Sequence, residues 1–328
     1  MMEQHNIVPL GLRRIGLSYW AAFVGCWLAT ALPLGALCGA EPQADPDFPP
    51  ELVRFQNYPK NPVFQAEGAG HWDVKIRERG WILRDQKTWH LWFTGYDGTR
   101  EGRRMLGYAT SPDGLQWTRS EHNPLDRDHW IEDMMVLERA GTFYMFAEGE
   151  RDQAQWLTSK DRIHWKREGT LNIRLASGEP IPPGPFGTPT AWYEDETWHL
   201  FYERSDLGVY LARSKDLKTW TNVQDEPVLA RGPEAYDKQQ IALNQIIRHK
   251  GRYYAYYHGS ASTTRPALWT TSVATSTDLI HWKKYAGNPL TPEQDNRSSG
   301  IVIPVDGGFR LYTMHDAVNV SLPVEGQP

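Results

Sequence analysis

The chain has 328 residues, of which 40% are hydrophobic and 23% charged, a mixture typical of a folded globular protein rather than a disordered one. The formal net charge of −5 and the absence of any basic run argue against a nucleic-acid partner. The 15 Trp and 15 Tyr residues suit both β structure and the stacking of sugar rings, two uses that composition alone does not separate.

Residues 1–40 have the pattern of a secretory signal peptide. Arg13 and Arg14 precede the apolar stretch 15–37, and small residues then lead to Ala40, after which the chain becomes acidic and Pro-rich. We therefore predict cleavage after Ala40 and a mature protein that is secreted or periplasmic, without an integral membrane domain. The alternative is an uncleaved anchor, because about 20 apolar residues can span a bilayer.

Both cysteines of the chain lie in this first segment. Cys38 has the bulky Leu37 before it, which disfavours a lipoprotein site, and Cys26 lies inside the apolar stretch. Cleavage after Ala40 would leave no thiol in the mature protein. The prediction therefore excludes a catalytic cysteine, a thiolate metal site and a disulfide.

Residues 41–328 contain an internal repeat. Four segments share the pattern Ser-x-Asp-x-x-x-Trp, and each follows a short strand-like run and, further upstream, an aromatic strand. A fifth aromatic strand near the C-terminus lacks the Ser/Asp/Trp turn. The four turns are 111–117, 159–165, 214–220 and 276–282, and the aromatic strands are 89–93, 143–146, 198–202, 253–257 and 309–312.

The spacing of these units predicts a β-propeller. Successive turns are about 48 to 62 residues apart, as expected for four-stranded blades. Five aromatic strands give five blades, and helical periodicity is essentially absent, so the predicted fold is an all-β, five-bladed β-propeller. We expect residues 52–64 to supply the outer strand of the last blade, because such N-to-C closure removes the exposed edges of an open array.

The repeated aspartates, although the most visible acidic residues, are predicted to be structural. An Asp in a tight turn accepts hydrogen bonds from backbone N–H groups, and four copies at one blade position argue for a scaffold, since an active site needs each role once. These residues are Asp113, Asp161, Asp216 and Asp278.

Strands that end in Ala-Thr-Ser-x-Asp-x-x-x-Trp, with Asn-Pro punctuation at Asn61, Asn123 and Asn288, resemble the five-bladed glycosidase superfamily. That group comprises glycoside hydrolase families 32, 43, 62, 68 and 117 and the family 130 mannoside phosphorylases. The resemblance covers residues 61–315 and implies a catalytic propeller that cleaves an oligo- or polysaccharide. The sequence departs from the Asn-Asp-Pro-Asn-Gly signature of family 32 and from the Asp-Pro pairs of family 43, so no single family is indicated.

Aligning the second strands of the blades isolates one position at which the residue type varies. Glu148, Glu203 and His258 occupy the same place at the ends of their strands, as does Thr94. Variation at a fixed repeat position is typical of function rather than scaffold. Glu203 and Glu148 are the candidate acids, which would need burial or a neighbouring negative charge to stay protonated.

Two histidines are rival candidates for the acid, because family 117 of the resembled group uses a histidine in that role. His258 shares the register of the candidate glutamates, and His315 lies one step past it, beside Asp316. We expect an Asp–His pair there to raise the pKa of the imidazole.

The starts of the innermost strands give the remaining candidates. By resemblance, Asp73 is the expected water-activating base at the start of blade one, with Asp133 or Glu132 as an orienting carboxylate and inversion as the expected outcome. The alternative is that such residues cap strands or pack between blades. The predicted substrate-binding residues are Trp72, Trp130, Glu132, Phe186, Thr188, Asp237, Gln240 and Asn244.

We expect no cofactor. Some family 43 members hold a cation near the central axis, but no ligand spacing here requires a metal. Two other functions remain open from the sequence. A glycan phosphorylase would need Arg, Lys or His side chains converging on the funnel, for which Arg100, Arg103 and Arg104 are candidates, and a non-catalytic carbohydrate-binding propeller would lack a carboxylate pair.

Overall fold

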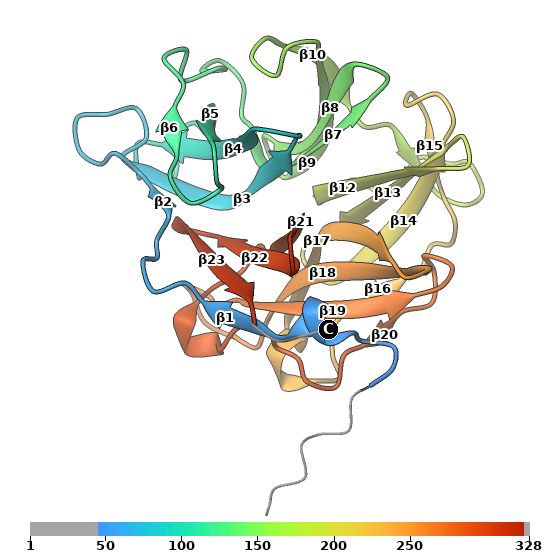
Figure 1. Cartoon of the computed structure of the whole chain (residues 1–328). Coiled ribbons are helices and arrows are strands. Elements are labelled where there is room, and N and C mark those ends of the chain that lie inside the picture. The colour runs from blue at the N-terminus through green and yellow to red at the C-terminus, as the bar shows by residue number, and fades with distance from the viewer. Residues whose placement is uncertain (1–44, 325–328) are drawn as a thin grey trace, which may run out of the picture. The chain divides into compact units, whose positions relative to one another are not determined.

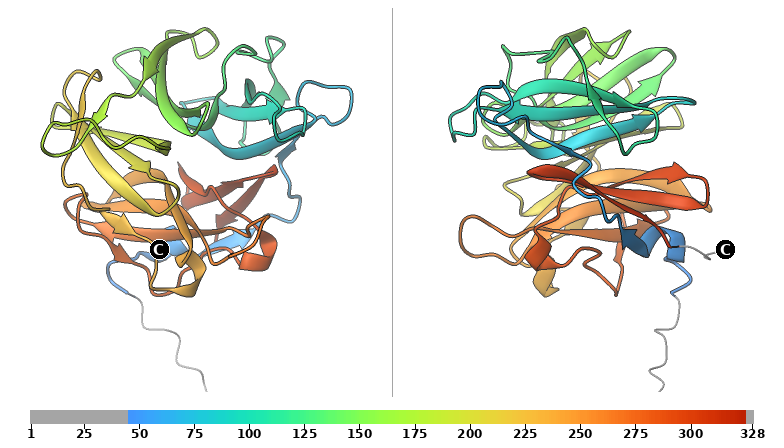
Figure 2. Two further views of the ribbon diagram at one scale, coloured as in Figure 1. Left: turned by 180° about the vertical axis from the view of Figure 1, so that it is seen from behind. Right: turned by 60° about the vertical axis from the view of Figure 1, so that its left-hand side comes forward.

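The computed structural model describes residues 45–324, which form five mainly antiparallel sheets around a central axis (Figure 1). The all-β, five-bladed propeller predicted from the repeat is confirmed. Figure 2 shows the same blades from behind and from the side. Residues 1–40, where the signal peptide is predicted, lie outside the described residues. None of the described helices is long and apolar enough to cross a membrane.

Each blade runs outward from an inner strand at the axis. Blade I contains β3 (Lys75–Arg84), β4 (Trp89–Tyr96), β5 (Met105–Ser111) and β6 (Thr118–Arg119). Blade II contains β7 (Glu132–Arg139), β8 (Thr142–Gly149), β9 (Gln153–Ser159) and β10 (Trp165–Thr170). Blade III contains β12 (Gly187–Glu194), β13 (Thr197–Glu203), β14 (Gly208–Ser214) and β15 (Trp220–Asn222), with β11 (Ile173–Arg174) and β16 (Leu229–Ala230) added.

Blade IV contains β17 (Gln240–His249), β18 (Arg252–Ser260), β19 (Thr270–Ser276) and β20 (Lys283–Lys284). Blade V contains β21 (Ile301–Val305), β22 (Gly308–Met314) and β23 (Ala317–Pro323). The short helical elements are α1 (Pro50–Val53), η1 (Ala235–Asp237) and η2 (Glu293–Asp295).

The N-terminal strands close blade V. β1 (Phe55–Asn57) pairs with the end of β23, with Phe55 opposite Pro323, and β2 (Phe64–Gln65) pairs with its start, with Phe64 opposite Val318. Figure 1 shows this blue segment beside the red C-terminal strands. The predicted N-to-C closure is therefore confirmed, and it covers a strand edge that would otherwise be open to pairing.

The aromatic second strands are buried along nearly their whole length. In β4 the seven residues from Trp89 to Gly95 are all buried, and β13 and β18 are similar. Each blade packs between two neighbours, so both faces of a strand meet protein and the sequence reads as a continuous apolar run. This explains the Trp-His-Leu-Phe and Tyr-Tyr-Ala-Tyr-Tyr segments.

The Ser-x-Asp-x-x-x-Trp turns are held by local hydrogen bonds, as predicted. Ser111 Oγ accepts from the backbone N–H of Gly114 at 2.8 Å, and Asp113 Oδ1 accepts from Leu115 and Gln116, each at 2.8 Å. The other three copies repeat this pattern with Asp161, Asp216 and Asp278. These aspartates therefore bind backbone within their own turns.

The side chain of Arg79 lies fully buried on the axis and binds four blades together. Its guanidinium donates to the carbonyls of Pro189 at 2.7 Å, Leu243 at 3.0 Å and Asn244 at 2.9 Å, and also to the carbonyl of Asp133. Burial lowers the pKa of Arg79 to about 10, against the opposing charge of Asp133, so the group stays a cation at neutral pH.

We predict that Arg79→Met lowers the free energy of unfolding by about 3–5 kcal/mol, because it leaves several buried carbonyls without donors. Urea unfolding followed by tryptophan fluorescence measures this loss. Arg79→Lys, which keeps the charge but has fewer donors, should lie between Met and wild type. The matched control is Arg100→Met at an exposed position, which should change stability by no more than about 0.5 kcal/mol. A loss below about 1 kcal/mol in Arg79→Met would contradict the role of the guanidinium.

Candidate active site

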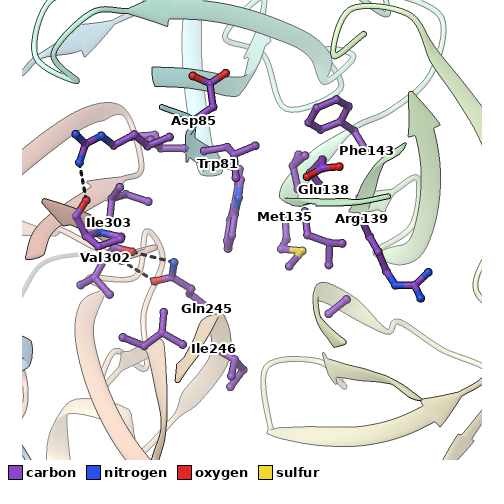
Figure 3. A pocket seen from close by; sticks show the side chains of 18 of the residues that line it. Trp81, Asp85, Met135, Glu138, Arg139, Phe143, Gln245, Ile246, Val302 and Ile303 are labelled. Carbon is purple, nitrogen blue, oxygen red and sulfur yellow. Dashed lines mark hydrogen bonds between the residues drawn. The ribbon is translucent and has the colours of Figure 1, made fainter. Parts of the chain in front are cut away.

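The central channel opens at two mouths with different chemistry. At the mouth where the inner strands end, a cavity of about 1340 Å³ is lined mainly by apolar residues such as Trp81, Met135 and Ile246 (Figure 3). Two of its acidic groups are engaged: Asp85 pairs with His90 at 2.9 Å and accepts from the turn backbone, and Glu138 Oε1 accepts from the backbone N–H of Gly141 at 2.7 Å. This cavity is large, but its lining residues include no pair of unengaged carboxylates for acid–base chemistry.

At the opposite mouth, called the funnel here, irregularities in the inner strands aim polar side chains inward. The pairing register shifts between Arg77 and Trp81, between Glu132 and Met135, and between Gly187 and Thr190. Three non-glycine residues have positive φ in these bulges, namely Glu78 at 56°, Asp133 at 48° and Thr188 at 44°. Such backbone is uncommon for these residue types and is typical of functional sites, where a bulge re-aims a side chain.

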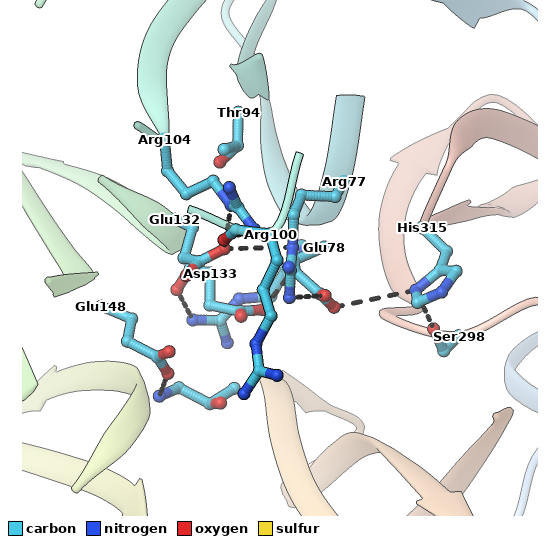
Figure 4. Close-up of polar contacts among 12 residues, drawn as sticks. Arg77, Glu78, Thr94, Arg100, Arg104, Glu132, Asp133, Glu148, Ser298 and His315 are labelled. Carbon is cyan, nitrogen blue, oxygen red and sulfur yellow. Dashed lines mark hydrogen bonds and ion pairs between the residues drawn. The ribbon is translucent and has the colours of Figure 1, made fainter. Parts of the chain in front are cut away.

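Acidic side chains from neighbouring blades form a row at the funnel. We use the name carboxylate row for five residues, which are Glu78, Asp133, Glu148, Glu203 and Asp206. Figure 4 shows Asp133 between Glu78 and Glu148. The predicted register of the second strands is confirmed, because Glu148 lies opposite Glu132 and Glu203 lies opposite Gly187.

Among the five residues of the carboxylate row, Glu78 is the one whose pKa is lowered. Burial would raise its pKa, but the charges of Arg77 and His315 outweigh that effect, so the pKa of Glu78 is lowered. Arg77 forms an ion pair with one carboxylate oxygen, and His315 Nδ1 lies 3.7 Å from the other. The side chain remains 22% exposed and so can reach a bound substrate or water.

Asp133 and Glu148, in contrast to Glu78, have raised pKa values. Burial raises the pKa of both carboxyls well above their ordinary values, and the charge of Glu78 raises that of Asp133 further. Asp133 Oδ1 accepts from the backbone N–H of Arg79 at 3.2 Å, and Glu148 Oε2 accepts from Thr188 at 3.0 Å. Among the described residues, no hydrogen bond reaches Glu148 Oε1. A protonated Glu148 could therefore donate from that oxygen.

Glu203 and Asp206 continue the carboxylate row into blade III. Burial raises the pKa of Glu203 to about 7 and that of Asp206 to about 6. Glu203 accepts from the backbone N–H groups of Gly187, at 2.9 Å, and of Asp206, while Gln240 donates to Asp206 Oδ2 at 2.8 Å. A Cβ atom on Gly187 would lie 2.1 Å from Glu148 and 2.7 Å from Glu203, so both carboxyls pack against this glycine.

Two arginines meet at Glu132. Arg77 Nε lies 3.1 Å and Arg104 Nε 3.6 Å from the same Glu132 oxygen, and Trp130 Nε1 donates to the other at 2.6 Å. The guanidinium of Arg104 also lies over the ring of Trp130, 4.7 Å from its centroid. Figure 4 shows Arg77, Arg104 and Glu132 beside Glu78.

The two candidate histidines have different surroundings from those expected. Burial lowers the pKa of His258 to about 3, and its Nδ1 is hydrogen-bonded to Asn244 Oδ1 at 2.7 Å. With this pKa the imidazole of His258 is neutral near pH 7 and is a poor proton donor, which argues against His258 as the acid. The expected pairing of His315 with Asp316 is not found, since the side chain turns to Glu78 and Ser298 and Asp316 is exposed.

Asp73 lies apart from the carboxylate row. It precedes β3, which begins at Lys75, and its side chain is 0% exposed in an ion pair of 2.7 Å with Arg119. Burial raises the pKa of Asp73, and Arg119 opposes this. In blade I the side chain at the funnel is instead that of Glu78, which lies in the bulge between Arg77 and Trp81, five residues after Asp73.

Three predicted substrate-binding residues pack inside the protein instead. The ring of Trp72 packs against that of Phe93 at a tilt of 32°, with centroids 5.7 Å apart, and Phe186 is a buried member of the main core. Asp237 is 0% exposed and forms an ion pair with Lys284. Their sequence positions near strand starts were right, but Trp72 and Asp237 are taken up by partners in their own blades, Phe93 and Lys284, and Phe186 is taken up by the main core.

The other predicted substrate-binding residues lie at the funnel. Gln240 binds Asp206, Asn244 binds His258, and Thr188 donates its backbone N–H to Glu148. Glu132 and Trp130 form the contact with Arg77 and Arg104 described above. No group of three or more His, Cys, Asp or Glu side chains in residues 45–324 is arranged to hold a metal ion. On the axis, the guanidinium of Arg79 already takes the carbonyls that could bind a cation.

Sequence reasoning missed Glu78, Asp206 and Arg77. Glu78 and Arg77 lie within a charged run, Lys75 to Arg79, that reads as a solvated strand, and only the bulge turns Glu78 inward. Asp206 lies in the turn after Glu203, with φ of 58°. The signal that could have found Asp206 is its position three residues after Glu203, at the end of an aromatic strand.

Comparisons with known proteins agree on the fold. No family model matches the chain. Two uncharacterized proteins of Mycobacterium tuberculosis, from strains CDC 1551 and H37Rv, are each 20% identical over 229 residues, which is 63% of this chain and 74% of theirs. A putative glycosidase from Bacteroides thetaiotaomicron has a TM-score of 0.67 at 16% identity, over 84% of this chain and 98% of that one.

Two further solved structures are enzymes with named substrates or ligands. The β-1,2-mannobiose phosphorylase from Listeria innocua has a TM-score of 0.62 at 13% identity, over 82% of this chain and 95% of that one. An α-L-arabinofuranosidase from Podospora anserina in complex with cellotriose has a TM-score of 0.60 at 12% identity, over 84% and 99%. The chain therefore has the five-bladed propeller fold of glycoside hydrolases and of a mannobiose phosphorylase.

We predict that Asp206→Asn changes the pH dependence of stability. Because the pKa of Asp206 rises from 3.8 to about 6 on folding, the folded state retains a proton that the unfolded state releases between about pH 4 and pH 6. Stability of the wild type should therefore fall as the pH rises through that window. The variant lacks this titrating group. Its free energy of unfolding relative to that of wild type should therefore rise by on the order of 2 kcal/mol between pH 4 and pH 7.

Urea unfolding at pH 4, 5, 6 and 7 measures the difference between Asp206→Asn and wild type. Asp195→Asn, in the exposed turn between β12 and β13, is the control and should follow the wild-type profile. A difference between Asp206→Asn and wild type that stays constant with pH would show that Asp206 titrates as an ordinary carboxyl.

Proposed function

We propose that this protein is an exported glycoside hydrolase that cleaves an oligo- or polysaccharide with inversion at the anomeric carbon. The observation that carries the proposal is the carboxylate row, in which Glu78 is held ionised while its neighbours are held protonated. Neighbouring acidic groups with opposite pKa tendencies are what acid–base cleavage of a glycosidic bond needs. The structural neighbours named above support the same class of reaction, and export rests on the pattern of residues 1–40.

Glu78 is the proposed base. Its carboxylate is ionised, is partly exposed at the funnel, and is fixed in direction by Arg77 and His315. In the proposed reaction it removes a proton from a water molecule as that water attacks the anomeric carbon. The resemblance-based assignment of this role to Asp73 has less support, because Asp73 is fully buried against Arg119.

Glu148 is the proposed acid. Burial and the charges of its neighbours favour its protonated form, and Oε1 is free of protein hydrogen bonds among the described residues. It would donate its proton to the leaving oxygen. Asp133, between the two, raises the pKa of Glu148 and keeps the orienting role expected from the sequence, while Glu203 supports the protonated form from the other side.

A glycan phosphorylase is the second candidate, because Arg77, Arg104 and His315 converge beside Glu78. The mannobiose phosphorylase among the structural neighbours adds to this candidate. Hydrolysis ranks first because Glu132 and Glu78 already neutralise both arginines. Turnover measured with and without inorganic phosphate separates the two, since a phosphorylase releases a sugar phosphate only when phosphate is present.

We predict that Glu78→Gln and Glu148→Gln fail in different ways. A screen of aryl glycosides and oligosaccharides, including mannosides and arabinofuranosides, first identifies a substrate. Glu78→Gln should lose about 10²–10⁴-fold in kcat with every leaving group, because water activation is needed for all of them. Glu148→Gln should lose a similar factor with oligosaccharides but stay within about tenfold of wild type with dinitrophenyl glycosides, whose leaving group needs no proton.

NMR of the first product anomer checks inversion in the same experiment. If both variants keep more than a third of wild-type kcat on the identified oligosaccharide, the carboxylate row is not the catalytic centre. If Glu148→Gln is equally slow with both kinds of leaving group, the acid is another member of the row.

A separate prediction concerns Asp73. Asp73→Asn weakens the buried ion pair with Arg119, so we expect a lower melting temperature. Its kcat, measured well below that temperature, should stay within about threefold of wild type. A loss of 10²-fold or more in kcat with an unchanged fold would return the role of base to Asp73.

A further inference from the structure

A second concave site lies on the funnel side of blade II, next to the carboxylate row. Its volume is about 390 Å³, within the range of about 300–1,000 Å³ that small-molecule sites occupy. The loop before β7, the turn between β8 and β9, and strand β10 form its walls. Gly149, which lines it, directly follows Glu148 in the chain.

Trp130 lines this cavity, and its indole is held in one orientation. Its Nε1 donates to Glu132 at 2.6 Å, and the guanidinium of Arg104 lies over the ring. The backbone carbonyl of Trp130 accepts from Gln155 Nε2 at 2.7 Å. A flat apolar ring fixed in advance loses little entropy on binding and suits the C–H face of a sugar ring.

Gln155 also fixes the polar wall. It is 2% exposed, and its Oε1 accepts from Arg167 Nε at 2.6 Å. Within the described part of the chain, the two terminal nitrogens of Arg167 donate no hydrogen bond, so they remain available to hydroxyl groups in the cavity. A rigid indole together with unengaged polar donors matches a ligand that has one apolar face and a hydroxylated rim, which is the chemistry of a sugar unit.

We propose that this cavity binds the leaving-group sugar of the substrate, stacked on Trp130 and hydrogen-bonded by Arg167. This inference rests on the proposed function, because an acid stands on the leaving-group side of the scissile bond and Gly149, which lines the cavity, directly follows Glu148 in the chain. The enzyme therefore recognises at least two sugar units, one on each side of the carboxylate row. Its substrate class is an oligosaccharide or polysaccharide chain rather than a sugar attached to a small aglycone.

Two variants test the subsite in different ways. Trp130→Ala removes the stacking ring, and Thr170→Trp fills the cavity from an exposed position on β10 without deleting a described side-chain hydrogen bond. The matched control is Trp192→Ala, a half-buried tryptophan that lines the cavity at the other mouth of the channel. The probes are the oligosaccharide identified in the screen and the glycosyl fluoride of the same terminal sugar, which has no leaving-group sugar or ring.

Thr170→Trp should raise KM for the oligosaccharide by about tenfold, the size expected when one stacking and hydrogen-bonding site is lost. Its kcat/KM for the glycosyl fluoride, whose fluoride leaving group does not fill the subsite, should stay within about threefold of wild type, and Trp192→Ala should match wild type on both probes. Trp130→Ala should also raise KM for the oligosaccharide. An unchanged KM for the oligosaccharide in Thr170→Trp, or an equal loss on both probes, overturns the subsite.

Failure of the proposed function is distinguishable from failure of the subsite. If the wild type turns over no probe, titration calorimetry with β-1,2-mannobiose, cellotriose and arabino-oligosaccharides replaces kinetics. Binding to wild type and Trp192→Ala that disappears in Thr170→Trp supports a sugar site without catalysis. Absence of binding to wild type, or binding that Thr170→Trp leaves unchanged, overturns the subsite independently of any chemistry.

Discussion

The guanidinium of Arg79 on the propeller axis is the interaction on which the funnel depends. It takes carbonyls from the inner strands of blades II, III and IV and belongs itself to blade I. The residues that supply these carbonyls are the bulge residues or their direct neighbours: Asp133, Pro189 after Thr188, and Asn244. Without this guanidinium, these irregular backbone carbonyls would be left unpaired at the centre of the five sheets. One buried cation satisfies them and so fixes where the functional side chains point.

That arrangement explains how several carboxyls remain close together. Three members of the carboxylate row accept hydrogen bonds from the backbone: Asp133 from the N–H of Arg79, Glu148 from Thr188, and Glu203 from Gly187 and Asp206. Anchored groups cannot move apart to relieve repulsion, so repulsion and burial favour protonation instead. Glu78 escapes this only because Arg77 and His315 lie beside it. The pKa of Glu78 therefore differs from those of Asp133 and Glu148 because Glu78 has cations beside it.

The register of the repeat predicted part of this site well. Glu148 and Glu203 were found because the aligned second strands differ there, and Asp133, Glu132, Gln240, Asn244 and Thr188 were found because they lie near the starts of inner strands. Glu78 was missed because a bulge that no periodicity reveals moves the inward-facing position along β3. Trp72, Phe186 and Asp237 have the residue types of a sugar site, but Phe93, the main core and Lys284 take up their side chains. The repeat pattern predicts where along a strand a residue lies, whereas the packing around it decides which way its side chain points.

The sequence by itself determined the architecture: the four Ser-x-Asp-x-x-x-Trp turns, the aromatic second strands and the N-terminal closing strand are local or periodic features, and local hydrogen bonds and burial enforce them. The tertiary structure alone decided the ionisation pattern of the funnel, the position of Arg79 and the cavity beside Glu148. The physical reason is that each of these depends on groups from different blades, tens to more than a hundred residues apart, such as Arg79 with Asn244. Charges and backbone carbonyls brought together across blades act through distance in space, which sequence spacing does not encode.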